Sequence, residues 1–80
     1  MMTDKVVVYT SPSCSWCRKL KSYLKAANVS FKEVDVSKDP SKAEELYRKS
    51  GQMGVPVTLV GSNVIVGFDK QKIDSLLGIH

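Results

Sequence analysis

Two cysteines, Cys14 and Cys17, are the residues of this 80-residue chain whose type and spacing are best suited to chemistry. A C-x-x-C pair can cycle between a dithiol and a disulfide, because one thiolate attacks a substrate disulfide and the second thiol resolves the mixed disulfide. A structural disulfide closing so short a loop would stabilise the fold by only about 2 kcal/mol. A zinc site needs four ligands, and the chain adds only one histidine, His80 at its last position. The spacing therefore favours redox chemistry.

The residues around the cysteines predict a strand followed by a helix. Val6–Tyr9 is a β-branched and aromatic run typical of a buried strand, and apolar residues recur at helical spacing over about residues 15–27. Cys14 then lies at the N-terminus of the helix, where free backbone N–H groups and the helix dipole stabilise a thiolate, and Arg18 adds positive charge. Cys17 lies one turn further along and is more shielded. We expect Cys14 to be the nucleophile and Cys17 the resolving thiol.

Capping residues mark the ends of the predicted helices. Asn28 is expected to end the first helix. Asp39 followed by Pro40 is typical of an N-cap and a first helical residue, and Asp69 is expected to cap a third helix. Glycines are expected to end the second and third helices, at Gly51 and Gly78. The side chains expected to face inward from these two helices are Ala43, Leu46, Tyr47, Ile73, Leu76 and Leu77.

The strands complete a single α/β domain over residues 1–80. Strands are expected at 31–36, 57–60 and 64–66, and Gly61-Ser62-Asn63 is a hairpin turn between the last two. The order is β-α-β-α-β-β-α. A parallel βαβ unit followed by an antiparallel hairpin predicts a mixed four-stranded sheet flanked by helices.

Composition limits the classes of partner. The formal charge is +4, from 12 Lys and Arg against 8 Asp and Glu, but the basic residues are dispersed. That pattern lacks the dense basic face of a nucleic-acid binder and favours anionic small molecules or acidic proteins. No apolar run is long enough for a signal peptide or a membrane span. We therefore expect a cytoplasmic monomer that binds neither nucleic acid nor membrane.

The pair Val55-Pro56 precedes the third predicted strand. Proline at the start of a strand can be an ordinary edge or turn residue. The alternative is a cis peptide bond packed beside the cysteines, where the backbone of Val55 can pair with an extended substrate.

Taken together and in this order, these motifs resemble the glutaredoxin family of the thioredoxin fold. The resemblance is carried by C-x-x-C, by Val55-Pro56 and by Val66-Gly67-Phe68-Asp69 before the last helix, and it spans essentially the whole chain. It implies a thiol–disulfide oxidoreductase, an electron carrier in cell redox homeostasis with a Cys14–Cys17 disulfide as its redox-active centre. It further implies no tightly bound cofactor, with glutathione as a co-substrate.

The resemblance also implies a substrate site. Val55 offers backbone hydrogen bonds to the cysteinyl part of glutathione beside the cis-proline, Pro56. Phe68 and Asp69, after Gly67, receive the γ-glutamyl end. Asp69 can serve as an N-cap alone or as an N-cap that also binds an amino group.

Departures from the common family pattern leave the reductant open. Ser15-Trp16 replaces Pro-Tyr between the cysteines, Ser11 replaces a lysine and Gly54 replaces a threonine. The positive charge that this lysine would bring to the glycyl carboxylate of glutathione can come from Arg18 or Lys19. The pair Gly67-Phe68 is also similar to NrdH-type redoxins, which reduce ribonucleotide reductase and are themselves reduced by thioredoxin reductase. An alternative is an iron–sulfur scaffold or carrier, in which Cys14 and glutathione hold a [2Fe–2S] cluster.

Trp16 has two interpretations. On an exposed first helical turn it is a hydrophobic contact for partner proteins or a lid over the disulfide, and in the core it would turn away from the loop. Its position in the first turn favours the exposed contact.

Overall fold

The computed structural model describes residues 6–52 and 54–78. Its elements are β1 Val6–Thr10, α1 Ser15–Ala26, β2 Lys32–Asp35, α2 Pro40–Ser50, β3 Val57–Val60, β4 Asn63–Val66 and α3 Lys70–Leu77. The predicted order β-α-β-α-β-β-α is confirmed, with bounds that agree to within one residue. None of the helices in this described part of the chain is long and apolar enough to cross a membrane.

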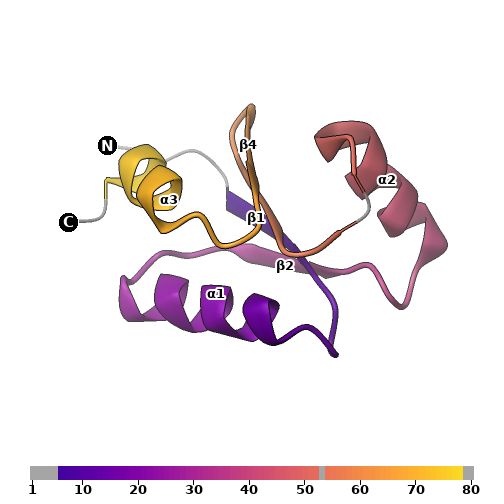
Figure 1. Cartoon of the computed structure of the whole chain (residues 1–80), viewed down its shortest axis with the longest axis horizontal. Coiled ribbons are helices and arrows are strands. Elements are labelled where there is room, and N and C mark those ends of the chain that lie inside the picture. The colour runs from indigo at the N-terminus through magenta and orange to yellow at the C-terminus, as the bar shows by residue number, and fades with distance from the viewer. Residues whose placement is uncertain (1–5, 53, 79–80) are drawn as a thin grey trace.

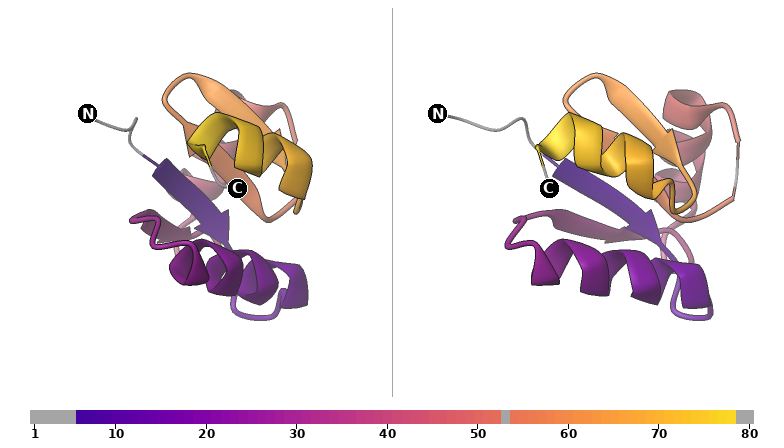
Figure 2. Two further views of the ribbon diagram at one scale, coloured as in Figure 1. Left: turned by 90° about the vertical axis from the view of Figure 1, so that its left-hand side faces the viewer. Right: turned by 60° about the vertical axis from the view of Figure 1, so that its left-hand side comes forward.

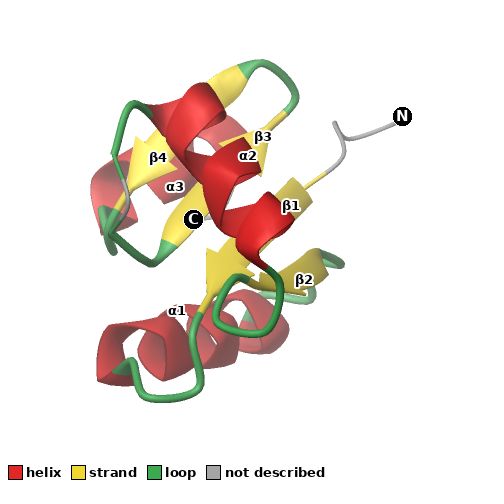
Figure 3. Cartoon of the chain, turned by 90° about the vertical axis from the view of Figure 1, so that its right-hand side faces the viewer, coloured by secondary structure: helices red, strands yellow, loops and turns green. Residues whose placement is uncertain are grey.

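The four strands form one mixed sheet in the order β2-β1-β3-β4. β1 runs parallel to β2, while β1 with β3 and β3 with β4 are antiparallel pairs. The helices lie on both faces of this sheet (Figure 1). Figure 2 shows α1 and α3 together on one face, and Figure 3 shows α2 in front of the other. The parallel crossover through α1 therefore brings the first turn of α1 to the end of β1.

The helix ends follow the predicted capping residues. Asp39 is the N-cap of α2 and accepts a hydrogen bond from the backbone N–H of Ser41 at 3.0 Å, with proline in the first turn. Gly51 ends α2 in the left-handed region at φ 79°. Asn28 also has a positive φ, 60°, just after α1, a conformation that asparagine tolerates better than most residues. The chain thus encodes its helix boundaries locally.

The core has two layers because successive residues of a strand point to opposite faces of the sheet. Val8 faces α1 and α3, whereas its neighbour Tyr9 faces α2. The fully or almost fully buried residues on the first face are Val6, Val8, Leu20, Leu24, Val60, Ile65 and Ile73. Those on the second face are Tyr9, Leu46, Val57 and Leu59.

The prediction that Tyr47 faces inward is wrong. Its side chain is 54% exposed, whereas the preceding residue, Leu46, is fully buried. One residue along a helix is a rotation of about 100°. The short α2 buries only a narrow stripe, so a residue next to Leu46 turns away from the sheet.

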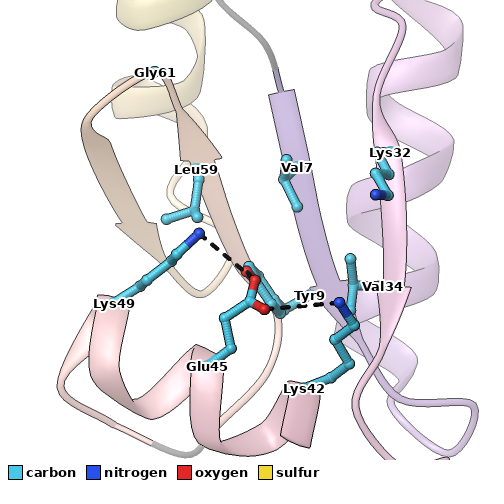
Figure 4. Close-up of a pocket in the computed structure, with 9 residues that line it drawn as sticks. All are labelled: Val7, Tyr9, Lys32, Val34, Lys42, Glu45, Lys49, Leu59 and Gly61. Atoms are coloured by element: carbon cyan, nitrogen blue, oxygen red, sulfur yellow. Dashed lines mark hydrogen bonds and ion pairs between the residues drawn. The ribbon is translucent and has the colours of Figure 1, made fainter. Parts of the chain in front are cut away.

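A hydrogen bond joins α2 to the centre of the sheet. Tyr9 donates its hydroxyl proton to the carboxylate of Glu45, which also pairs with Lys42 at 3.7 Å and Lys49 at 3.6 Å. These groups line a cavity of about 280 Å³ between α2 and the sheet (Figure 4). Burial, with help from Glu45, raises the pKa of Tyr9 to about 12. The contact fixes the strand that leads into the cysteine loop.

Candidate functional site

Cys14 is the N-cap of α1, at the junction that the sequence predicts. Its backbone is extended (φ −94°, ψ 112°), and its sulfur accepts a hydrogen bond from the backbone N–H of Cys17 at 3.2 Å. The Cys14 side chain is partly exposed. Since the first turn of a helix leaves its N–H groups without intrahelical partners, the sulfur occupies a position rich in donors. A substrate can reach it from solvent.

Cys17 is the buried member of the pair. Its exposed fraction is 0%, and both cysteines are free thiols. Burial, followed by interaction with the Cys14 sulfur, raises the pKa of Cys17 to about 11. The two thiols are therefore chemically unequal, one accessible and one shielded.

The loop before β3 approaches the first cysteine. The Val55–Pro56 peptide bond is cis, which supports the second interpretation of this pair. The Cys14 thiol donates to the backbone carbonyl oxygen of Val55 over 3.8 Å. The N–H of Gly67 donates to the carbonyl oxygen of Pro56 at 2.8 Å. Three loops, from distant parts of the sequence, therefore meet at the cysteine.

A groove of about 280 Å³ lies at this meeting point. Trp16 is 55% exposed, as favoured from the sequence, and its ring meets that of Phe68 edge-on with 6.3 Å between centroids. The groove is lined by five of the predicted site residues: Trp16, Val55, Pro56, Gly67 and Phe68. None of these lining residues carries a charge. The groove can hold an apolar or extended chain beside the thiol.

Two of the residues predicted to bind substrate lie outside the groove lining. Arg18 donates from Nη1 to the carbonyl oxygen of Pro12 at 3.3 Å. Asp69 is the N-cap of α3, and its carboxylate accepts from the N–H of Lys72 at 3.2 Å. Both charged groups thus have local partners that hold the loops around the site.

Sequence reasoning missed the support behind Phe68. The ring of Tyr23 on α1 packs against Phe68 with 5.5 Å between centroids, and its hydroxyl donates to the carboxylate of Asp74 on α3. Lys70 also bonds that carboxylate, at 2.9 Å. The pair Lys70 and Asp74 is visible in the sequence at i,i+4 spacing, but its partner on α1 is set by tertiary packing. This network links α1 to α3 under the groove.

A dithiol pair on a mixed sheet, with a cis-proline loop beside it, defines the thioredoxin-fold class of thiol–disulfide oxidoreductases. The family model for glutaredoxin matches residues 6–65. A glutaredoxin-like 8.6 kDa protein of the rubredoxin operon of Clostridium pasteurianum, itself uncharacterised, is 44% identical over 72 residues, which are 90% of this chain and 96% of that protein.

Solved structures agree with this assignment. A mutant of the thioredoxin-like protein BC3987 has a TM-score of 0.90 and 33% identity, covering 95% of this chain and 97% of the other. The glutaredoxin-like NrdH-redoxin of Escherichia coli has a TM-score of 0.80 and 28% identity, covering 90% and 93%. The chain belongs to the glutaredoxin family, and its activity is that of a thiol–disulfide oxidoreductase.

Proposed function

We propose that this protein is a dithiol electron carrier that reduces disulfides in polypeptides, and that it uses them in preference to glutathione mixed disulfides. The observation that carries the proposal is the uncharged groove beside Cys14, with Trp16 and Phe68 as its aromatic walls. Aromatic side chains of this kind dominate the energetics of protein contacts.

The first step is attack by Cys14. Its thiolate displaces one sulfur of the substrate disulfide, R–S–S–R′, forming Cys14–S–S–R and releasing R′–S⁻, which takes a proton from solvent. Pairing of an extended substrate with the backbone of Val55 would align its disulfide with the Cys14 sulfur, which already lies 3.8 Å from the Val55 oxygen.

The second step is resolution by Cys17. Its thiol loses a proton to solvent, and the thiolate attacks the Cys14 sulfur, expelling R–S⁻, which is then protonated. The substrate gains two electrons and two protons, and the protein is left with a Cys14–Cys17 disulfide. Because Cys17 is fully buried, it reacts only with a disulfide already attached to Cys14.

The charges around the groove support the choice of substrate. Glutathione has two carboxylates and an ammonium group, and each needs a charged partner when it leaves water. Arg18 is engaged with the Pro12 carbonyl and Asp69 with the N-terminus of α3. Lys19 lies over the Trp16 ring, 4.6 Å from its centroid. An extended peptide with an apolar side chain needs none of these charges.

The proposed electron source is a protein dithiol rather than glutathione. We assign reduction of the Cys14–Cys17 disulfide to a dithiol protein of the thioredoxin-reductase kind. The structural likeness to NrdH-redoxin, described as having a thioredoxin-like activity profile, supports this choice. Disulfide-containing enzymes such as ribonucleotide reductase are the client class, in the reducing cytosol. Nothing in the described residues favours the iron–sulfur alternative.

Parallel turnover assays test the proposal. One contains thioredoxin reductase, NADPH and a peptide disulfide flanked by apolar residues; the other contains glutathione, glutathione reductase, NADPH and a glutathionylated peptide. We expect the catalytic efficiency to be at least about tenfold higher in the first assay, equivalent to about 1.4 kcal/mol of transition-state binding. Higher efficiency in the glutathione assay would overturn the preference, and no turnover in either would overturn the carrier function.

A further inference from the structure

An ion pair joins α1 to β2 beside the resolving cysteine. Lys21 lies four residues after Cys17, on the same face of α1. Its Nζ is 2.7 Å from the Glu33 carboxylate on β2. The same carboxylate oxygen accepts a hydrogen bond from the hydroxyl of Thr10, at the end of β1, at 2.9 Å. The Glu33 carboxylate is therefore held by both Thr10 and Lys21, and it fixes the position of the Lys21 ammonium.

Thr10 also connects this ion pair to Cys17 through the backbone. Thr10 is 2% exposed, and the backbone of the next residue, Ser11, favours the Cys17 thiolate. Cys17 thus has the Ser11 backbone acting on it, together with Lys21, which lies one turn further along the same helix. Lys21 and Ser11 lower the pKa of Cys17, against the larger opposing effect of burial.

We propose that Lys21 is a positioning residue for the resolving step, stabilising the Cys17 thiolate as it attacks the Cys14 sulfur. Glu33, itself held by Thr10, keeps the ammonium in place and neutralises part of its charge. This inference rests on the proposed dithiol cycle.

The resolving step is where such a charge matters most. A thiol with a pKa of about 11 is ionised in only roughly one molecule in ten thousand at pH 7. Proton loss from Cys17 creates a negative charge away from water, and a nearby cation makes that charge less costly. Three other charged groups face this region: Glu33, paired with Lys21; Lys25, which acts on Glu33 from one turn further along α1; and Asp35 at the end of β2, on which Lys21 also acts.

Reaction with dithiobis(nitrobenzoate) separates the two steps. Attack by Cys14 releases one nitrothiobenzoate, and resolution by Cys17 releases the second as the protein disulfide forms. Stopped-flow absorbance follows both, and the Cys17→Ser background reports attack alone. The variants are Lys21→Met, Lys21→Arg, Glu33→Gln and the charge-matched control Lys25→Met.

We expect Lys21→Met to slow the second release about three- to tenfold at pH 7 and to move its pH profile upward by about half to one pH unit. Lys21→Arg restores the rate to within about twofold, and Lys25→Met leaves it unchanged. Glu33→Gln keeps an acceptor for both partners but removes the negative charge, so the second release becomes faster. The first release is unchanged throughout.

Three results would overturn the role of Lys21. These are an unchanged second release in Lys21→Met, an equal slowing in Lys25→Met, or a slower release in Glu33→Gln. A merely structural role predicts slowing in every Lys21 and Glu33 variant without displacement of the pH profile. If the wild-type protein releases no nitrothiobenzoate at all, the dithiol cycle itself fails, which is a distinct outcome.

Discussion

The Cys14 sulfur lies 3.8 Å from the backbone carbonyl oxygen of Val55, although 41 positions separate the two residues in the chain. This contact joins the N-terminus of α1 to the cis-proline loop before β3. An extended polypeptide that pairs with the loop backbone would present its disulfide to the exposed thiol. The geometry therefore couples recognition of main chain to attack on sulfur.

The aromatic walls of the groove should contribute to substrate affinity. Replacing Trp16 with alanine removes the wall that contacts Phe68, and we expect about a tenfold loss of catalytic efficiency toward a peptide disulfide with apolar flanks. Tyr47→Ala is the matched control, because Tyr47 is 54% exposed, as Trp16 is 55%, but lies on α2. Steady-state kinetics should show the control within about twofold of wild type. Equal losses in both variants would contradict a specific role for Trp16.

The carboxylate of Asp69 should act as a helix cap. Asp69→Ala removes the acceptor of the Lys72 N–H, and we expect a loss of about 1 kcal/mol in the free energy of unfolding. Asp69→Asn keeps an acceptor and should stay within a few tenths of a kcal/mol of wild type. Chemical denaturation measures both. Peptide turnover should be unchanged in Asp69→Asn, and a large loss there would indicate a substrate contact instead.

The resolving step should accelerate with pH. Burial is the largest cause of the raised pKa of Cys17, and this effect persists after Cys14 has entered a mixed disulfide. The rate of the second release should therefore rise about tenfold per pH unit from pH 7 to 9, following the fraction of thiolate. A rate that levels off near pH 7 would show that Cys17 ionises much more readily than its burial implies.

Tyr9 should make stability fall at high pH. Its pKa is raised to about 12 in the folded protein, against about 10 when unfolded, so its stabilising contribution is complete below pH 10 and is lost as the pH rises toward 12. Tyr9→Phe should cost about 1 kcal/mol near neutrality, because the bond to Glu45 is lost. The difference in unfolding free energy between wild type and variant should shrink over that pH range. A constant difference would contradict this titration.

Local signals explain why the helix ends and the position of Cys14 could be predicted from sequence. An Asp-Pro start at Asp39, a left-handed Asn28 and a left-handed Gly51 each depend on residues only a few positions away. Tyr47 shows the limit of this reasoning, because the width of the stripe that a helix buries depends on how much of the sheet it covers.

The cross-element contacts could not be read from the sequence. Tyr23 behind Phe68 and Lys21 beside Glu33 join elements that are brought together only by the sheet order. The residues that line the groove were named as candidates through the family resemblance, whereas the contact of Arg18 with Pro12 depends on the conformation of the loop.

The most direct test of the dithiol cycle is intact-protein mass spectrometry of two variants, Cys17→Ser and Cys14→Ser, after incubation with a peptide disulfide. We expect Cys17→Ser to accumulate one covalent peptide adduct on Cys14. We expect Cys14→Ser, left with only a buried thiol, to form adduct at least about a hundredfold more slowly. An adduct that forms equally fast in Cys14→Ser, or in neither variant, would contradict Cys14 as the nucleophile.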